Sequence, residues 1–413
     1  MKQVLYAVLF LVLGVFSGGR ATNTKLKEVF SWKQLDYKFE DESARNLSLE
    51  TGELIKEHNL PLGLEVWKDK VFITVPRWKS GVPSTLNYVP KNGSNSPELI
   101  PYPSWDFNNI SNAENGTVIV NTFRVRADEC DRLWVMDCGI NNILGSSQQL
   151  SLPKILVFDL KTDKLIREYK LKPGSVKEDS FFANVVVDIA NTETGCDSAF
   201  AYIPDLGSYG LIVYSWADND SWRIKHHYFH FDPLAGNYHI GGINFQWTDG
   251  IFGLALSPPD AEGYKTLYFH PLSSTREFAV STKIVQNKTI ASDSYYEYKV
   301  LGSRGPNSQA TASMVDQKSG VLFYTQVNKN GVGCWNPASG DYSADTNGLI
   351  ATDNVTMVFP NDLKVDRDSN LWILTDRLPS FIYTHLDFND TNFRVLSAPV
   401  QEIIEGTVCE QKK

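Results

Sequence analysis

The chain has few cysteines and few long hydrophobic runs. Five cysteines in 413 residues are too few for a disulfide scaffold, so a hydrophobic core must stabilise the fold. The odd number leaves at least one thiol unpaired or intermolecular. The longest apolar run, residues 4–16, is too short to cross a bilayer core of about 30 Å, and no later run is long enough for a membrane helix. The sequence therefore predicts a mature chain without a membrane span.

The first residues have the three-part pattern of a secretory signal peptide. Lys2 precedes the apolar run, and small residues follow it within 17–21. We therefore predict a signal peptide at 1–21 and a secreted mature chain, 22–413, that forms a single domain.

Eight Asn-x-Ser/Thr sequons agree with an extracellular location. Any one of them is equally compatible with an unmodified surface turn, but eight sequons behind a signal peptide predict glycosylation. They lie at Asn46, Asn92, Asn109, Asn115, Asn219, Asn287, Asn354 and Asn389.

The charge balance and the missing motifs exclude several function classes. A net charge of −9 and a pI near 5.4 argue against binding to nucleic acid or acidic lipid and mildly favour cationic ligands. The sequence has neither a Gly-x-Ser-x-Gly nucleophile elbow nor a phosphate-binding loop. No low-complexity or Pro-rich linker divides the chain.

Helical periodicity is scarce and best at 43–60, which we expect to lie outside the main fold. Six times the chain presents a turn and then a short apolar segment with a central aromatic residue, at intervals of roughly 50 to 70 residues. That interval suits a four-stranded antiparallel sheet with its loops. We therefore predict an all-β, six-bladed β-propeller; two stacked β-sandwiches are the alternative. The six aromatic residues are Phe72, Trp134, Tyr202, Tyr268, Phe323 and Trp372.

Hairpin patterns lie between these segments. Residues 155–171 and 210–231 each contain two apolar strands around a polar turn, Lys161–Asp163 in the first and Asp218–Asp220 in the second. In addition, the second half of "FPNDLKVDRDSNLWILTD" (359–376) closely repeats "RVRADECDRLWVMD" (124–137). We interpret this echo mainly as a structural repeat.

Several segments resemble the insect yellow and major royal jelly protein family, in the family's order and over nearly the whole mature chain. They are "PYPSW" (101–105), "CDRLWVMDCG" (130–139), "PKILVFDL" (153–160), "GLIVY" (210–214), "DGIFGLALSP" (249–258), "SGVLF" (319–323), "GCWN" (333–336) and "NFRVL" (392–396). Within the family the chain is most similar to the yellow-related proteins of sand fly saliva. That resemblance implies a six-bladed propeller whose channel binds biogenic amines.

The resemblance also implies a disulfide pattern. Cys130 would pair with Cys196 and Cys334 with Cys409, which leaves Cys138 as a free thiol packed like a small apolar group. The alternative places Cys138 in one of the pairs, because Cys130 lies close to it in sequence.

The resemblance carries amine binding onto Asn361 and Thr346 and places Leu363 in the slot for the ligand's ring. An amide oxygen can accept a hydrogen bond from an ammonium group without the desolvation cost of a buried carboxylate. If the segment is extended, Leu363 shares a face with Asn361. Leu363 supplies shape but cannot stack as an aromatic residue would. The alternative role of Asn361 is a turn cap.

Four acidic residues are further candidates for the channel. Asp137, Asp205 and Asp376 follow their repeat's aromatic residue at similar distances and could make the channel mouth attractive to cations; the alternative is that they cap turns. Asp249 is a candidate lining residue, although its Asp-Gly pair is also typical of a tight turn.

Two enzyme classes are alternatives to binding. A dopachrome-converting enzyme of the yellow type needs a general acid or base, for which histidine is the natural donor. The only cluster, "HHYFHFD" (226–232), is expected on a solvated outer strand, where it forms no local metal triad. A calcium-dependent lactonase would use Asn361, Asp249 and Asp376, but no calcium-loop motif is present.

The expected function is stoichiometric capture of biogenic amines without catalysis, cofactor or metal. The ligands are serotonin, noradrenaline, adrenaline, dopamine and, as a smaller member, histamine. We expect a monomeric protein secreted into saliva, where removing these mediators would oppose vasoconstriction and platelet activation. Stoichiometric capture requires a free energy of binding of about −9 kcal/mol or stronger.

Overall fold

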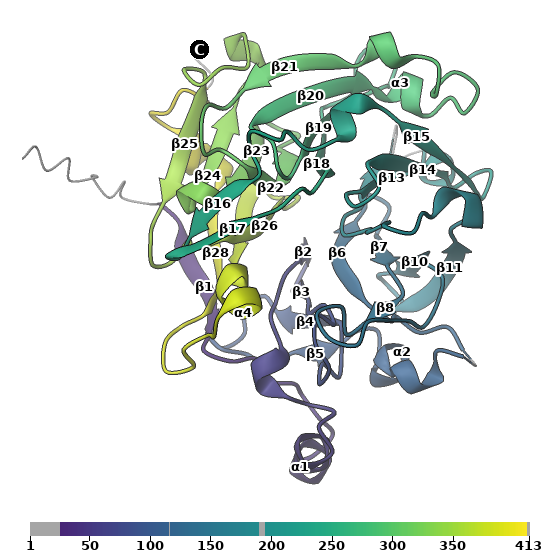
Figure 1. Ribbon diagram of the computed structural model, residues 1–413, viewed down its shortest axis with the longest axis vertical. Coiled ribbons are helices and arrows are strands. Elements are labelled where there is room, and N and C mark those ends of the chain that lie inside the picture. The colour runs from purple at the N-terminus through teal and green to yellow at the C-terminus, as the bar shows by residue number, and fades with distance from the viewer. Residues whose placement is uncertain (1–24, 115, 190–194, 411–413) are drawn as a thin grey trace, which may run out of the picture.

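Strands dominate the computed structural model, which describes residues 25–114, 116–189 and 195–410. Six four-stranded antiparallel sheets are arranged as blades around a common axis (Figure 1). The predicted all-β, six-bladed propeller is confirmed, and the stacked sandwiches are wrong. The predicted signal peptide lies outside the described residues.

The blades follow one another in chain order, and the strands of each blade lie side by side from the innermost to the outermost. Blade 1 comprises, in that order, β2 (Leu64–Trp67), β3 (Lys70–Thr74), β4 (Leu86–Pro90) and β5 (Ile100–Pro101); blade 2 comprises β6 (Thr122–Ala127), β7 (Arg132–Asp137), β10 (Lys154–Asp159) and β11 (Lys164–Lys170). Blade 3 comprises β12 (Val186–Asp188), β13 (Phe200–Asp205), β14 (Gly210–Ser215) and β15 (Asp220–Lys225); blade 4 comprises β18 (Ile251–Leu256), β19 (Thr266–Pro271), β20 (Arg276–Ser281) and β21 (Lys299–Ser303). Blade 5 comprises β22 (Ala310–Val315), β23 (Leu322–Gln326), β24 (Gly331–Trp335) and β25 (Asn347–Thr352); blade 6 comprises β26 (Pro360–Val365), β27 (Asn370–Thr375), β28 (Phe393–Pro399) and β1 (Lys27–Trp32).

Blade 6 closes the ring because it combines the two ends of the chain. Its outermost strand, β1, pairs antiparallel with β28, so that Lys27 lies opposite Ser397 and Trp32 opposite Phe393. Phe30 and Trp32 are buried, and the Trp32 indole Nε1 donates to the Pro97 carbonyl at 2.9 Å. An early segment of the chain therefore completes the last blade.

The six repeated aromatic residues occupy one equivalent place in the fold. Each lies in the second strand of its blade: Phe72 in β3, Trp134 in β7, Tyr202 in β13, Tyr268 in β19, Phe323 in β23 and Trp372 in β27. All six are buried. The repeat therefore builds the blades, as predicted.

The sequence repeated in blades 2 and 6 stabilises the same turn in both blades. Asp128 and Asp366 begin the turn between the first two strands of these blades, and each accepts a hydrogen bond from the indole Nε1 of the tryptophan six residues later. The distances are 2.7 Å to Trp134 and 2.9 Å to Trp372. Each carboxylate also accepts backbone N–H groups of its own turn. Because both turns need this acceptor, the aspartate and the tryptophan recur together.

The two disulfides each join neighbouring blades. Cys130, in the β6–β7 turn, is bonded to Cys196, which precedes β13. Cys334, in β24, is bonded to Cys409 near the end of the chain. Cys138 is a buried free thiol, and burial raises its pKa. The pairing implied by the resemblance is confirmed, and the alternative that placed Cys138 in a pair is wrong.

Short helices and two two-stranded ribbons lie outside the six four-stranded sheets. The predicted helical segment contains α1 (Glu42–Glu50), capped by Asp41, and lies outside the blades (Figure 1). The other helices are α2 (Trp105–Asn108), α3 (Thr282–Val285), α4 (Leu378–Tyr383) and α5 (Val400–Ile404), and the ribbons pair β8 (Ile140–Asn141) with β9 (Gln148–Gln149) and β16 (Asn237–Ile240) with β17 (Ile243–Gln246). Within the described ranges, no helix is both long and apolar enough to cross a membrane.

The core consists of apolar layers between neighbouring blades. Between blades 2 and 3, for example, Trp134 and Ile155 pack with Ile203 and Ile212. Both predicted hairpins are present, as β10–β11 and β14–β15. Asp163 and Asn219 have positive φ at their tips, a conformation that Asp and Asn tolerate better than most residues.

Candidate functional site

An apolar cavity lies where the innermost strands of the blades converge. It has a volume of about 330 Å³. Residues in the first strand of each blade, or just before it, line the cavity: Leu62, Phe123, Arg124, Ala183, Asp249, Phe252, Thr311 and Asn361. Loops and helix α4 complete the wall. We call this space the axial cavity.

Aromatic side chains form much of the wall of the axial cavity. Phe123 contacts Trp78 and Phe181 edge to face, with ring centroids 5.0 Å and 4.9 Å apart. On another part of the wall, Trp247 Nε1 donates to the Tyr383 hydroxyl oxygen at 2.7 Å, which leaves the hydroxyl proton available to another acceptor. The cavity therefore offers flat apolar surfaces to an aromatic ring.

Asp249 is the acidic group in this apolar wall. Its carboxyl has no hydrogen-bond or ion-pair partner among the described residues, and burial alone raises its pKa to about 6. A carboxylate in such surroundings favours a cation that enters the cavity, because the cation supplies the missing counter-charge.

The backbone around Asp249 shows why the Asp-Gly pair does not form a turn. The chain runs from Asp249 directly into β18, and Gly250 donates its N–H to the Leu206 carbonyl. A Cβ at Gly250 would lie 2.6 Å from the Phe229 carbonyl oxygen, so glycine permits a close approach of two chain segments. The tight-turn alternative is wrong, and Asp249 lines the cavity.

Asn361 also lines the axial cavity, but its side chain is already bonded at both ends. Its Oδ1 accepts from Arg124 Nη2 at 2.7 Å, and its Nδ2 donates to Asp376 Oδ2 at 2.6 Å. The Asn361 carbonyl accepts from Arg124 Nη2 at 2.6 Å and from Thr311 Oγ1 at 2.9 Å. Asn361 therefore holds the wall together through a buried network.

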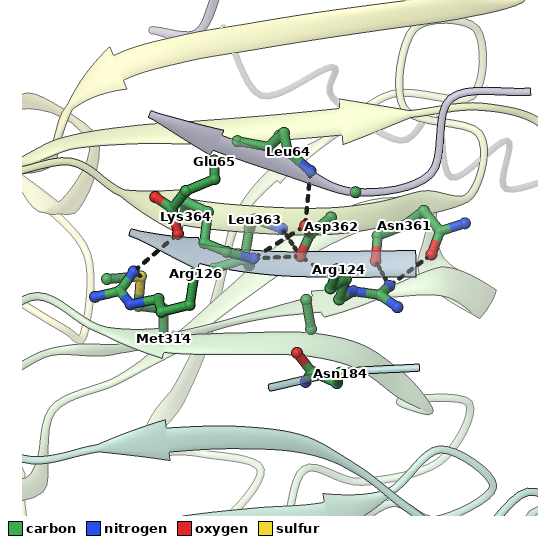
Figure 2. A network of polar contacts seen from close by, with 12 residues as sticks. Leu64, Glu65, Arg124, Arg126, Asn184, Met314, Asn361, Asp362, Leu363 and Lys364 are labelled. Atoms are coloured by element: carbon green, nitrogen blue, oxygen red, sulfur yellow. Dashed lines mark hydrogen bonds and ion pairs between the residues drawn. The ribbon is translucent and has the colours of Figure 1, made fainter. Parts of the chain in front are cut away.

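Figure 2 shows this network continuing along the axis. Asp362 accepts from Arg124 Nε at 3.3 Å, from Lys364 Nζ at 2.9 Å and from the Leu64 backbone N–H at 2.9 Å. The Arg124 guanidinium also lies over the Phe252 ring, 4.5 Å from its centroid. The charge of Arg124 is therefore matched within the network.

A second, smaller cavity lies beyond Asp362, on the side of Arg126 and Lys364 (Figure 2). Its volume is about 40 Å³, which suits water molecules but not an aromatic amine. The Arg124–Asp362 contact lies between the two cavities.

The other two predicted ligand-binding residues lie away from the axial cavity. Leu363 is fully buried in the apolar layer between blades 5 and 6. A register shift between Pro360 and Asp362 interrupts the alternation of β26, so Leu363 does not share the cavity-facing side of Asn361. Thr346 precedes β25, the outermost strand of blade 5, and its hydroxyl closes a local turn with Ser343. The structure thus brings neither residue to Asn361.

Asp137, Asp205 and Asp376 are structural caps. All three are fully buried at the ends of equivalent second strands or immediately after them. Asp137 accepts three backbone N–H groups, and Asp205 accepts two and also forms an ion pair with Arg223 at 2.7 Å. Asp376 accepts from the Leu378 N–H and from Asn361. The interpretation of these residues as turn caps is therefore confirmed, and their carboxylate oxygens bond to the surrounding backbone and side chains.

Two of the three oxygen donors considered for calcium, Asn361 and Asp376, bond to each other, and Arg124 contacts Asn361 as well. In the described ranges, no cluster of three or more His, Cys, Asp or Glu residues could hold a metal ion.

The histidine cluster is not on an outer strand. It follows β15 in a 3₁₀ turn, His227–Phe229, where His226 caps the turn and is buried against Tyr298 with ring centroids 4.1 Å apart. His227 and His230 are exposed. The expectation of a solvated strand was therefore wrong for His226, and none of the three lines the axial cavity.

The family model and the sequence relatives indicate one family. Residues 120–409 match the family model described as "Major royal jelly protein". The chain is 43% identical over 408 residues to "Protein yellow" of Drosophila subobscura, which covers 98% of this chain and 70% of that protein. It is 44% identical over 390 residues to "Protein yellow" of Drosophila melanogaster, covering 94% and 71%. A solved luciferin-regenerating enzyme is similar at a TM-score of 0.45 and 10% identity, covering 83% of this chain and 92% of that one.

Proposed function

The chain belongs to the major royal jelly protein family, and on that premise we propose that its axial cavity binds one small aryl-alkylamine in the protonated form. The ligands are serotonin and the catecholamines noradrenaline, adrenaline and dopamine, with histamine as a smaller member of the class. The observation that supports this proposal best is the Asp249 carboxyl, which has no cationic partner among the described residues and lies in an aromatic cavity.

The dimensions and chemistry of the cavity suit such ligands. A volume of about 330 Å³ is within the range of small-molecule sites and too small for a folded peptide. The ammonium group pairs with Asp249, and the aromatic ring lies between apolar walls that include Phe123 and Trp247. The Tyr383 hydroxyl proton can be donated to a hydroxyl group of the ligand's ring. The ligand's ammonium group, aromatic ring and ring hydroxyl therefore each have a complementary group in the cavity wall.

In this proposal the ammonium acceptor is Asp249, and Asn361 has a supporting role. Asn361 keeps the Arg124 guanidinium bonded to the network, so that this cation does not turn towards the incoming amine. Asn361 lines the cavity, and because an amide oxygen has two lone pairs, its Oδ1 has capacity for one further hydrogen bond besides that from Arg124.

Capture of one amine per chain, without turnover, is the use that we propose for this site. Members of this family are generally secreted, and a secreted acidic protein with one such cavity would act as an amine scavenger. In a blood-feeder's saliva, this activity would oppose vasoconstriction and platelet activation.

Isothermal titration calorimetry of the purified mature protein with serotonin tests the proposal. We expect saturable binding of about one molecule per chain at a Kd well below micromolar. Asp249→Asn should weaken binding at least tenfold, whereas Asp69→Asn, an exposed change in the β2–β3 turn, should leave it unchanged. Absence of binding by the wild-type protein would refute amine capture.

The second candidate function is isomerisation of an aminochrome such as dopachrome, with Asp249 as the general base. The observation that favours it is the pKa of Asp249, raised to about 6, which is close to the optimum for proton transfer near neutral pH. Turnover of dopachrome by the same preparation, abolished in Asp249→Asn, would support this candidate. Binding without turnover would support capture.

A further inference from the structure

A large open groove lies on the outer rim between blades 3 and 4, remote from the axial cavity. Its volume is about 1120 Å³. Blade 3 contributes Phe200, Trp222 and the tip of the β14–β15 hairpin, and blade 4 contributes helix α3 with the turn that follows it. Several contacts tie these walls together. Trp222 Nε1 donates to the Val285 carbonyl at 3.0 Å, and Lys288 Nζ lies 2.8 Å from Asp220 Oδ2. Gln286 Nε2 donates to Asp188 and to the Tyr202 hydroxyl oxygen.

Two of the predicted glycosylation sequons lie in the walls of this groove. Asn219 is at the hairpin tip of blade 3, and Asn287 follows helix α3 of blade 4; both are exposed. The two attachment positions therefore face one groove from its opposite sides.

Both asparagines are held so that the amide nitrogen is free. Asn287 Oδ1 accepts from the Thr289 backbone N–H at 3.1 Å. Asn219 Oδ1 accepts from the Tyr214 hydroxyl at 2.8 Å and from Arg167 Nη1 at 2.9 Å. The Nδ2 atom of each, which is the atom that receives a glycan, has no partner within the described part of the chain. These contacts fix the orientation of the amide and hence the direction in which an attached sugar leaves.

The chemistry of the groove suits a carbohydrate. Half-buried Phe200 and Trp222 present ring surfaces on which the C–H faces of pyranose rings can stack. Asp218, Lys288 and other charged groups offer hydrogen bonds to hydroxyl groups. Ile290, which is 39% exposed at the rim, would be covered by a bound sugar chain.

Tethering favours an attached glycan over a free sugar. A ligand linked covalently at the wall of its own site has an effective concentration in the millimolar range, so weak contacts are sufficient to keep it bound. A free sugar would need much higher affinity than such an open groove provides.

We propose that an N-linked glycan on Asn287 lies in this groove and joins the rims of blades 3 and 4. Attachment forms a bond between Asn287 Nδ2 and the anomeric carbon of an N-acetylglucosamine residue. The bond from that carbon to the pyrophosphate of a lipid-linked oligosaccharide donor breaks, and the amide loses one proton. The glycan adds contacts between the rims of these blades, beyond the hydrogen bonds and the ion pair that already join them.

The test uses the full-length chain secreted from insect cells. Peptide mass spectrometry first determines whether Asn287 carries a glycan. Hydrogen–deuterium exchange of residues 218–222 and 282–290 is then compared before and after enzymatic trimming of the native protein to a single N-acetylglucosamine. We expect trimming to increase exchange in both segments at least about threefold.

Two sequon variants provide the same test genetically. Asn287→Gln removes the attachment atom, and Thr289→Ala removes the sequon but keeps Asn287. Both should increase exchange in the same segments and lower the unfolding temperature by about 2 °C. Asn389→Gln, which removes an exposed sequon in blade 6, is the matched control and should change neither segment. An unoccupied Asn287, or exchange that trimming leaves unchanged, would overturn the proposal.

Discussion

The strongest prediction concerns the pH dependence of amine binding through Asp249. The carboxyl must be ionised to pair with an ammonium group, and burial raises its pKa to about 6. An alkylamine remains protonated throughout the range from pH 5 to pH 8, as lysine does with its ordinary pKa near 10.4. Asp249 is therefore the group whose titration should control binding in this range.

The expected magnitude follows from that pKa. At pH 7.4 nearly all molecules carry an ionised Asp249, whereas at pH 5 only about one in ten does. The affinity for serotonin should consequently fall about tenfold between these pH values, or about 1.4 kcal/mol. Replacing Asp249 with asparagine should cost about 1.5–3 kcal/mol at pH 7.4, the usual contribution of a hydrogen bond to a charged group. The variant should also lose the pH dependence.

The same carboxyl should affect stability in the opposite direction. Its pKa is higher in the folded protein than its ordinary value of 3.8, so the folded protein binds the proton more tightly than the unfolded chain does. The contribution of Asp249 to stability is therefore most favourable below about pH 4 and is lost as the pH rises through about 6. Above that pH, Asp249→Asn should increase the free energy of unfolding of the unliganded protein by about 1–3 kcal/mol.

The assay combines calorimetry with denaturant unfolding at pH 5, 6 and 7.4 for the wild type, Asp249→Asn and Asp69→Asn. The distinguishing result is a variant that is more stable at pH 7.4 and binds amine more weakly. A misfolded variant would lose both stability and amine binding. Serotonin binding that is independent of pH, or that survives in Asp249→Asn, would refute the assignment of Asp249 as the counter-ion.

Three further predictions concern the fold around the site. Asn361→Ala should lower the free energy of unfolding by about 2 kcal/mol and weaken amine binding by about 1–3 kcal/mol, because Arg124 loses an acceptor inside the network; unchanged affinity in calorimetry would remove Asn361 from the site. Cys409→Ser should cost about 2–4 kcal/mol in urea unfolding and Cys138→Ala about 1 kcal/mol, since only the first opens a disulfide; equal losses would contradict this. Gly253→Ala places a Cβ against His270 Nε2 and should lower the unfolding temperature, whereas Gly174→Ala meets no atom within 4 Å and should not; similar unfolding temperatures for the two variants would show that the packing adapts.

The fold was predictable because its repeat is carried by residues with an obligatory structural role. Trp134 and Trp372 must bury a large ring and satisfy an indole N–H, and an aspartate at a fixed distance does so in both blades. Such a pair leaves a visible pattern even when loops vary in length. The outermost strand of blade 6 was not predictable in this way, because β1 pairs with β28 across almost the whole length of the chain.

The candidate site was only partly predictable. Asn361 lines the cavity, but its two side-chain hydrogen bonds depend on Arg124 and Asp376, whose positions follow from the closed ring. Strict alternation along an extended strand predicts Leu363 on the same face as Asn361, but the register shift in β26 breaks that alternation. Asp249 had an Asp-Gly signature typical of a turn. Its importance depends on the absence of a partner among the described residues, which no local pattern encodes.

The fully buried acids of this protein differ from the half-buried Asp249 in having partners. Asp137, Asp205, Asp362 and Asp376 are fully buried, and each accepts hydrogen bonds from backbone N–H groups, with side-chain donors at the last three. The same kinds of hydrogen bond could also stabilise a carboxylate at position 249. Asparagine at that position would avoid the cost of placing a charge in an apolar wall. The unpaired Asp249 carboxyl should lower the stability of the free protein. A ligand cation that forms an ion pair with it would explain why it is there. The axial cavity is lined by Asp249 together with aromatic side chains, and the proposed ligand, a cation that carries an aromatic ring, has groups complementary to both.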